Sequence, residues 1–434
     1  MIYHLFELLK DCDIPGQRLF TYLSFRAIFA SATAILISLI FGKKIIRWLQ
    51  KKQIGEEIRD LGLEGQMQKK GTPTMGGVII IVAILISVLL FADLTNIYII
   101  LLLVTTVWLG LLGFADDSIK VFRHNKEGLS EKAKLAAQVI LGLSIGITVC
   151  FSNDIVVRER IPLSTDTGTV SAADSTIVDK DSELRVNSGQ WAEQDVVKST
   201  KTTIPFVKNH EFDYKWLSPF KGAAGWYCKW AIYVVMIVLV ITACSNGTNL
   251  TDGMDGLSTG TSAIVGVVLG IFAYLSGNIL NAEYLNIMYI PGTGEIAVFM
   301  AAFVGALIGF LWYNSYPAQV FMGDTGSLAI GGIIGVCAIL IRKELLLPVL
   351  CGIFLVESLS VLMQRFYFKY TKRRYGTGKR IFRMAPLHHH FQKENVPALI
   401  NIPKRAVPEA KIVVRFWIIG ILLAVFTIAL LKIR

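Results

Sequence analysis

Two acidic residues stand three positions apart in the segment 249–256, which reads NLTDGMDG and lies between two long apolar runs. Charged side chains at membrane-crossing segments usually have a function, such as binding a substrate or an ion. If the segment is helical, Asp252 and Asp255 share one face and can both point at one cation or phosphate group. A solvated turn rich in Asn, Asp and Gly is the alternative. We therefore take Asn249, Asp252 and Asp255 as candidate site residues.

Three further aspartates occur at the ends of apolar runs. Asp116 and Asp117 close the run that ends in GFADD, and Asp324 opens another run within FMGDTGS. Adjacent acids on a helix diverge by about 100°, so one can face a site while the other holds a lysine or a helix end. Asp324 is either an N-cap or, in a cleft that it shares with Asp252 and Asp255, a direct ligand of Mg²⁺, which takes one or two carboxylates plus phosphates and water.

A segment rich in glycine and lysine, 69–77, reads KKGTPTMGG and precedes the second apolar run. Glycine lets the backbone approach a ligand closely, and a lysine ammonium suits a phosphate or carbonyl oxygen. Lys69 and Thr74 are therefore candidate contacts to an anionic ligand. A basic turn flanking a membrane segment is the alternative.

Three consecutive histidines, His388, His389 and His390, follow a proline and leucine in PLHHHF. Consecutive side chains on a helix cannot all face one metal ion, so contact with a substrate phosphate or proton transfer is favoured over a zinc site. Glu357 and Gln364 are seven residues apart and share one helix face. They predict either a polar contact between helices or a wall of the same cleft.

The composition is that of a polytopic membrane protein. Of 434 residues, 53% are hydrophobic and 17% charged, and the mean hydropathy is +0.56. The net charge of +11 does not indicate nucleic-acid binding, because Lys and Arg cluster in loops beside apolar runs, which is typical of a chain embedded in a lipid bilayer. The six cysteines show no metal-binding spacing.

Ten apolar runs are each long enough to cross the bilayer, and they predict an all-α protein with about ten transmembrane helices. They cover 20–41, 75–93, 96–114, 133–151, 229–246, 258–276, 296–313, 327–342, 344–363 and 413–431. Four helices then belong to residues 1–151 and six to residues 229–434. Residues 152–228 form an insertion outside the membrane.

Basic residues set the expected orientation. Eight Lys or Arg residues lie between 43 and 70 and eight between 365 and 383, whereas 91–96 and 277–295 contain none. The basic loops should be cytoplasmic. All the polar motifs then face the cytoplasm and form one active-site cleft, and both termini lie outside.

The insertion is polar, and its apolar stretches at 155–157 and 203–207 predict short strands. Cys150 and Cys228 bracket it. On the oxidising side of the membrane a disulfide between them is chemically permitted. Two small apolar residues at helix ends are the alternative.

Six motifs in order resemble the phospho-N-acetylmuramoyl-pentapeptide transferases, which belong to the polyprenyl-phosphate N-acetylhexosamine-1-phosphate transferases. The motifs are KKGTPTMGG (69–77), GFADD (113–117), NLTDGMDGLS (249–258), NSYPAQVFMGDTGS (314–327), MAPLHHHF (384–391) and IVVRFWIIG (412–420). The PLHHHF form favours the muramoyl-pentapeptide branch. Residues 151–227 and 392–407 are longer than the motifs require.

The resemblance implies Mg²⁺-dependent transfer of phospho-MurNAc-pentapeptide from UDP-MurNAc-pentapeptide to undecaprenyl phosphate in the bacterial cytoplasmic membrane, giving lipid I and UMP. It also implies a homodimer. By motif position, Asp324 is the metal ligand and Asp116 activates the lipid phosphate. The other implied positions are catalytic Asp117 and His388, and substrate-binding Lys69, Thr74, Asn249, Asp252, Asp255, Asn314, His389 and His390.

Three other functions are compatible with parts of the sequence. A sister enzyme would transfer N-acetylglucosamine-1-phosphate or a related sugar phosphate to the same lipid. A transporter would use the membrane-buried Glu357 and the Gly-rich segments, but its site should lie near the midplane, whereas most acids here lie at the ends of the runs. A receptor or scaffold would leave the acidic clusters unexplained.

Overall fold

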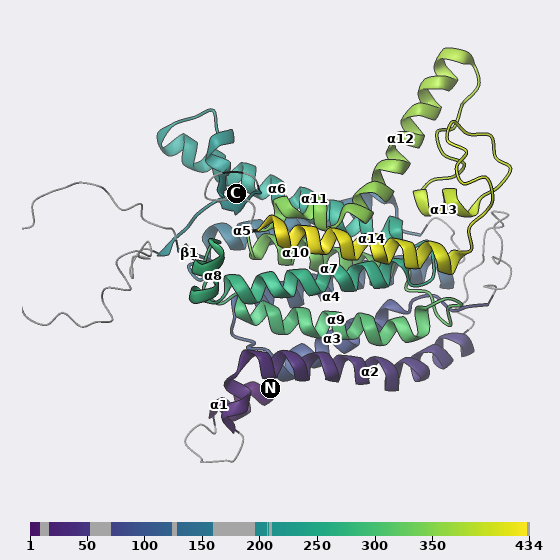
Figure 1. The fold of residues 1–434 in the computed structure, drawn as a ribbon. Coiled ribbons are helices and arrows are strands. Elements are labelled where there is room, and N and C mark those ends of the chain that lie inside the picture. Colours follow the sequence, from purple (N-terminus) through teal and green to yellow (C-terminus); the bar gives the residue numbers. More distant parts are fainter. Residues whose placement is uncertain are drawn as a thin grey trace, which may run out of the picture.

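The computed structural model describes residues 1–8, 17–52, 71–123, 128–158, 196–205, 207 and 211–431. Lys69 lies outside this described part of the chain. The described residues form a bundle of roughly aligned helices, with a few short strands at one end (Figure 1).

Some helices follow one another after short turns, and others after longer segments such as 376–386 and 393–408. The N-terminal half contains α1 (Ile2–Leu8), η1 (Gln17–Thr21), α2 (Leu23–Lys51), α3 (Gly77–Phe91), α4 (Ile97–Phe122) and α5 (Glu131–Phe151). The C-terminal half contains η4 (Tyr214–Leu217), α6 (Gly222–Thr251), α7 (Leu257–Ser276), α8 (Ile279–Leu285), α9 (Gly294–Asn314), α10 (Gly323–Leu340), η5 (Glu344–Leu346), α11 (Leu347–Leu350), α12 (Gly352–Tyr375), α13 (Leu387–Gln392) and α14 (Glu409–Leu430).

The helices confirm a multi-pass membrane protein. In the described part of the chain, eight are long and apolar enough to cross a bilayer, and a ninth crossing results if the pair 344–350 and 352–375, bent by 77°, is counted as one. The predicted run that is not among these nine is 75–93, which corresponds to α3 and its 15 residues. At 1.5 Å per residue it is about 22 Å long, shorter than the roughly 30 Å of hydrocarbon.

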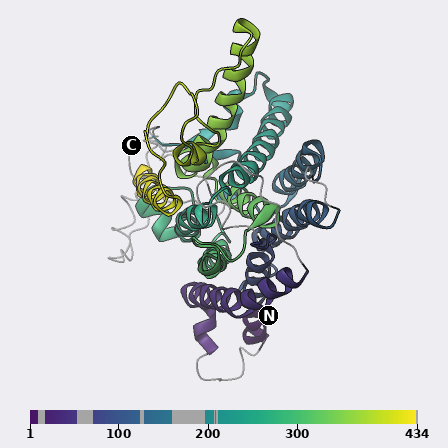
Figure 2. The ribbon, with the colours of Figure 1, turned by 90° about the vertical axis from the view of Figure 1, so that its right-hand side faces the viewer.

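Helix α10 lies at the centre of the bundle, and every residue from Thr325 to Leu340 is buried. Figure 2 views the bundle from the end where α13 lies, so that many helices are seen along their axes. Close packing onto α10 depends on small residues. A Cβ on Gly113 of α4 would overlap the Asp324 carbonyl, and one on Gly331 would overlap the Cys244 carbonyl of α6. Glycine therefore lets two neighbouring helices approach the α10 backbone.

We call the end of the bundle that holds Asp116 and Asp324 the acidic end, and the other end, where α10 meets η5, the opposite end. In Figure 1 the acidic end is on the right, and the distal half of α12 projects away from the bundle there. The turn at the opposite end is fully enclosed, since Arg342, Lys343 and Glu344 are each no more than 2% exposed.

Two small antiparallel sheets lie at the opposite end. β1 (Val157–Arg158) pairs with β2 (Val196–Val197), and β3 (Lys201–Thr203) pairs with β4 (Glu211–Asp213). The β content expected in the insertion is thus present, although β3 precedes most of the predicted stretch 203–207. Residues 159–195 lie outside the described part, so the division at residues 151 and 228 stays a prediction.

The insertion is tied to the helix bundle by polar contacts. The Thr203 amide donates to the Arg342 carbonyl at 3.0 Å, and Lys343 Nζ donates to Thr203 Oγ1 at 2.7 Å. The Tyr214 hydroxyl donates to Glu344 Oε1 at 3.1 Å. The insertion therefore covers α10 at the opposite end of the bundle. Cys150 and Cys228, both in the described part, are free thiols, so the disulfide that the sequence permits is not formed.

Candidate active site

The first turn of α10 is held by a carboxylate from α4. Asp117 is buried and accepts hydrogen bonds from the amides of Asp324 (3.1 Å) and Thr325 (2.9 Å) and from the Thr325 hydroxyl (2.6 Å). The first amides of a helix have no partner within the helix, so an acceptor there stabilises its beginning. Asp117 performs the capping role, which leaves the Asp324 side chain available for other contacts.

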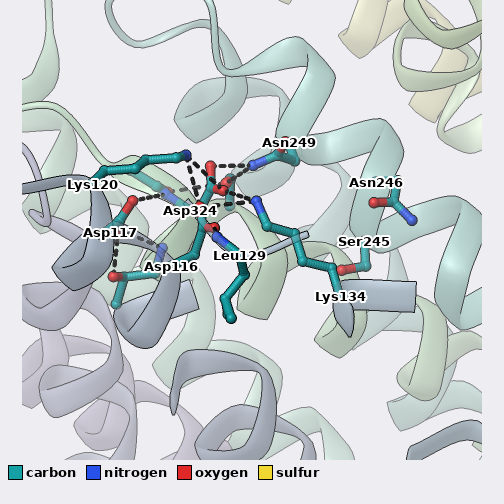
Figure 3. Close-up of polar contacts among 12 residues, drawn as sticks. Asp116, Asp117, Lys120, Leu129, Lys134, Ser245, Asn246, Asn249 and Asp324 are labelled. Carbon is teal, nitrogen blue, oxygen red and sulfur yellow. Dashed lines mark hydrogen bonds and ion pairs between the residues drawn. The ribbon is translucent and has the colours of Figure 1, made fainter. Parts of the chain in front are cut away.

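The Asp324 side chain meets two lysines and a second aspartate (Figure 3). Its Oδ2 accepts from Lys120 Nζ at 3.1 Å and from Lys134 Nζ at 2.7 Å. The same two ammonium groups lie 2.7 and 2.8 Å from Asp116 Oδ2. Each lysine therefore bridges Asp116 and Asp324.

Two further contacts fix the orientation of these carboxylates. Asp116 Oδ1 accepts from the Leu129 amide at 2.7 Å, and Asp324 Oδ1 accepts from Asn249 Nδ2 at 2.8 Å (Figure 3). Asn249, near the end of α6, also donates to Ser327 Oγ at 2.9 Å. The site therefore combines residues of α4, α5, α6 and α10.

These carboxylates can hold a metal ion. One oxygen each from Asp116, Asp117 and Asp324 lies within 4.8 Å of the others. Three carboxylates against two ammonium groups leave one net negative charge, and carboxylate oxygens are the ligands that hard divalent cations prefer. The Asp324 side chain is 15% exposed and that of Asp116 is 0% exposed, so access is from the Asp324 side.

Asp252 and Asp255 are not part of this carboxylate group. Helix α6 ends at Thr251 and α7 begins at Leu257, so the helical face predicted for the two acids does not exist. Asp252 is the C-cap of α6, and Gly256 has a φ of +77° that suits glycine. Residues 252–256 therefore form the turn that the sequence offered as the alternative, and among the described residues Asp324 groups with Asp116 and Asp117 instead.

Asp255 and Asn314 instead join neighbouring loops. Asp255 is buried, and its Oδ2 accepts from the Ala318 amide at 3.0 Å. Asn314 Oδ1 accepts from the Gly256 amide at 3.1 Å and the Thr259 hydroxyl at 2.7 Å, while its Nδ2 donates to the Val320 carbonyl. Both residues therefore hold the turn 252–256 against the segment 315–322.

The segment 71–77 lies beside the beginning of α10. The Phe321 amide donates to the Pro73 carbonyl and the Gly76 amide to the Phe321 carbonyl, both at 2.8 Å. Thr74 is buried, and its hydroxyl would lie 3.0 Å from a Cβ on Gly323. Thr74 therefore lies beside the first residue of α10, one position before Asp324.

The three histidines of α13 have different surroundings. His388 is 0% exposed, and its Nδ1 lies 3.2 Å from Glu357 Oε2 of α12. His390 Nδ1 accepts from the Arg383 amide at 3.0 Å, and its Nε2 contacts the Ile402 carbonyl at 2.9 Å, so backbone groups occupy both ring nitrogens. Burial, and after it the nearby Arg383, lowers the pKa of His390, although the Ile402 contact opposes this. His390 is thus held neutral as a structural group.

Gln364, on the same helix face as Glu357, also contacts the protein backbone. Its Oε1 accepts from the amides of Ile381 and Phe382 at 3.1 and 3.0 Å. Of the two predictions for the pair, the polar contact between helices fits Glu357, which accepts from the His388 amide of α13. Gln364 instead binds the non-helical segment before α13.

Sequence reasoning did not assign roles to Lys120 and Lys134. Lys120 carries a local signal, because it follows Asp116 by four residues and so lies on the same helix face. Lys134 has none. It belongs to α5, and only the packing of α5 beside α4 brings it to Asp116.

Comparisons with known proteins agree with the motifs. Residues 197–342 match the model of glycosyl transferase family 4, and residues 69–81 match signature 1 of phospho-N-acetylmuramoyl-pentapeptide-transferase. Proteins with that name from Parabacteroides distasonis, Porphyromonas gingivalis and Flavobacterium psychrophilum are 56%, 54% and 53% identical to the chain, each over 437 residues. Each alignment covers 100% of both chains, so these relatives also contain the segments 151–227 and 392–407.

Proposed function

Because the chain belongs to the phospho-N-acetylmuramoyl-pentapeptide-transferase family, we propose that it transfers phospho-MurNAc-pentapeptide from UDP-MurNAc-pentapeptide to undecaprenyl phosphate, giving lipid I and UMP. The observation that carries this proposal is the convergence of three carboxylates and two lysines at one end of a membrane bundle. Phosphoryl transfer between two anionic substrates requires positioned charges more than a strong nucleophile.

The metal in this proposal is Mg²⁺, held by Asp324 with Asp116 beside it. The fit rests on the carboxylate oxygens within 4.8 Å of one another and on the partial exposure of Asp324. When bound, Mg²⁺ neutralises charge on the phosphates. Asp117 serves the reaction by fixing the first turn of α10, and with it the position of Asp324.

The lysines are suited to the phosphate of the lipid substrate. Lys120 is 35% and Lys134 19% exposed, and both ammonium groups already neutralise carboxylates in the cluster. A phosphate that enters beside Asp324 can take over these ammonium groups, which frees Asp116 Oδ2 to accept a proton or to assist the attack. This exchange of partners is the role that we assign to the two lysines.

The remaining candidates form the side of the site that binds the nucleotide-linked donor. We assign Thr74, Asn249, Asp252, Asp255 and Asn314 to the cleft wall, together with Lys69, which lies outside the described residues. His388 stays a catalytic candidate through Nε2, which faces Gly253, and His389 lies beside it with ring centroids 4.2 Å apart. For His390 we now favour an indirect role, because both of its nitrogens bind the backbone.

We place the acidic end in the cytoplasm and both termini outside, in the bacterial cytoplasmic membrane. The support is the number of basic residues in 43–70 and 365–383. Among the described residues, the C-terminal end of α2 and the distal half of α12 lie at the acidic end (Figure 1). A site at this interface can receive a water-soluble donor and a lipid-anchored acceptor together. A homodimer is also proposed, on family resemblance alone.

The test is release of UMP by the purified protein in detergent with undecaprenyl phosphate and Mg²⁺. We expect release from UDP-MurNAc-pentapeptide, no release from UDP-N-acetylglucosamine, and loss of activity with EDTA. Release from the glucosamine donor alone would keep the reaction type but assign the sister activity. No release from either donor would contradict the transferase proposal.

A further inference from the structure

Glu409 is a buried acid that the proposed reaction does not use. It is the first residue of α14 and 8% exposed. Its Oε1 accepts from the Asp255 amide at 2.8 Å, and its Oε2 accepts from Gln392 Nε2 at 3.3 Å. Burying a carboxylate is costly unless donors surround it, although the helix N-terminus also favours its charge. Glu409 thus joins the turn 252–256 to the C-terminal end of α13.

The contact to Gln392 determines which way its amide group points. An ionised carboxylate is only an acceptor, so Gln392 must present its NH₂ group to Glu409. Its carbonyl oxygen then points the other way, where it lies 3.2 Å from His389 Nδ1. A carbonyl oxygen is only an acceptor, so His389 must carry a proton on Nδ1.

This choice of tautomer decides what His389 offers on its other side. A neutral imidazole with its proton on Nδ1 has a lone pair on Nε2. His389 Nε2 faces the turn 252–256, because it would lie 3.2 Å from a Cβ on Gly253. The lone pair therefore points to the turn that Glu409 also holds through the Asp255 amide.

We propose that Glu409 is a positioning residue that acts at two points of the site. Through Oε1 it fixes the backbone of the turn at Asp255, and through Gln392 it keeps the proton of His389 on Nδ1, so that Nε2 is presented to Gly253 as an acceptor. The part of this inference that concerns catalysis depends on the proposed transferase function. The part that concerns the tautomer does not depend on any substrate.

The first experiment is nitrogen-15 NMR of protein labelled at histidine, with His389 assigned by comparison with His389→Gln. The chain has six histidines, so the spectrum is simple. We expect wild-type His389 to be protonated on Nδ1, and Glu409→Gln and Gln392→Ala to give a mixture of tautomers. Protonation of wild-type His389 on Nε2 would overturn the proposal even if neither variant folds.

The second experiment measures UMP release by the same variants. We expect Glu409→Gln to lower kcat/KM by about 10- to 100-fold, because a small misplacement of reacting groups has effects of this size. The matched control is Glu394→Gln, since Glu394 is exposed and accepts from the Ala406 amide in the same connection between α13 and α14. It should keep wild-type activity and the wild-type tautomer.

The two measurements separate the possible results. Lower activity of Glu409→Gln with an unchanged His389 tautomer would contradict the relay through Gln392. Equal behaviour of Glu409→Gln and Glu394→Gln would reject any special role for Glu409. If the wild type releases no UMP but shows the expected tautomer, the transferase proposal fails while the positioning geometry stands.

Discussion

The two ends of α10 carry ionisable groups in opposite kinds of surroundings. At the acidic end, the Asp324 side chain is 15% exposed and meets two partly exposed lysines. At the opposite end, Lys343 is 1% and Glu344 2% exposed, and both bind residues of the insertion. Charges that are enclosed by fixed partners hold a structure in place, whereas charges that water can reach are able to exchange a protein partner for a ligand.

The comparison also explains how the central helix is held. Asp117 binds the first turn of α10, and Thr203 and Tyr214 bind the turn that follows its last residue. Changes at the acidic end should therefore reduce the reaction and spare the fold. Changes at the opposite end should alter stability and spare the reaction.

The largest effect is expected for Asp324→Asn. Loss of the carboxylate removes the proposed metal ligand, so UMP release should fall by about 10³-fold or more, as when other groups that stabilise a transition state are removed. The matched change at the opposite end is Glu344→Gln, which should keep release within about twofold. Similar losses in both variants would show that the two ends do not divide their roles in this way.

Lys134→Met should have the next largest effect. Asp116 and Asp324 would keep Lys120 but lose the ammonium group of Lys134, which is the closer of the two to Asp324. We expect kcat/KM for undecaprenyl phosphate to fall by about 10- to 100-fold, with most of the change in KM. Lys132→Met is the control, because Lys132 is exposed on the same helix. An unchanged KM would exclude Lys134 from the lipid phosphate site.

Lys343→Met tests the opposite end through pH. Lys343 lies in the turn between α10 and η5, where burial lowers its pKa to about 8 from 10.5. The unfolded chain then binds more protons between pH 8 and 10.5, so wild-type stability should rise through this window. Below pH 8 the buried charge costs on the order of 3 kcal/mol.

The thermal unfolding midpoint in detergent gives the readout for this variant. The midpoint of Lys343→Met should be higher than that of the wild type at pH 7, and the two should converge near pH 10. Lys201→Met removes a partly exposed lysine of β3, the strand whose Thr203 binds Lys343. This variant should follow the wild-type pH dependence. A constant difference between Lys343→Met and wild type over this range would mean that Lys343 does not titrate there.

The smallest effect is expected for Tyr214→Phe. The change removes one hydrogen bond to a buried carboxylate, at a cost of about 1–3 kcal/mol. The unfolding midpoint should fall and UMP release should not change. Tyr227→Phe, at a tyrosine that is 69% exposed, should leave both properties unaltered. A loss of activity in Tyr214→Phe would indicate coupling along α10.

The membrane helices could be predicted from the sequence because bilayer thickness imposes a length on each apolar run. Identification of the candidate acids also followed, since Asp116, Asp117 and Asp324 stand at the ends of such runs. Which of the candidate acids lie together in space could not be predicted from the sequence. Asp252 and Asp255 have helical spacing, but the chain leaves the helix at Thr251. The Asn, Asp and Gly residues of this segment favour a turn without fixing the residue at which the helix ends.

Contacts between distant segments account for the rest. Lys343 stands between the predicted runs 327–342 and 344–363. It and Arg342 are buried because the strand β3, some 140 residues earlier, covers them. Glu409 and Gln392 meet only because α13 and α14 pack together. Such pairings depend on tertiary packing, which residue spacing within one segment does not encode.

The central claim is that Asp324, and not Asp252, belongs to the metal site. It is tested most directly by measuring Mn²⁺ binding to the purified protein, with Mn²⁺ as a paramagnetic substitute for Mg²⁺. We predict that Asp324→Asn abolishes binding and that Asp252→Asn leaves it within about threefold of wild type. Wild-type binding by Asp324→Asn together with loss of binding in Asp252→Asn would contradict the assignment of the site.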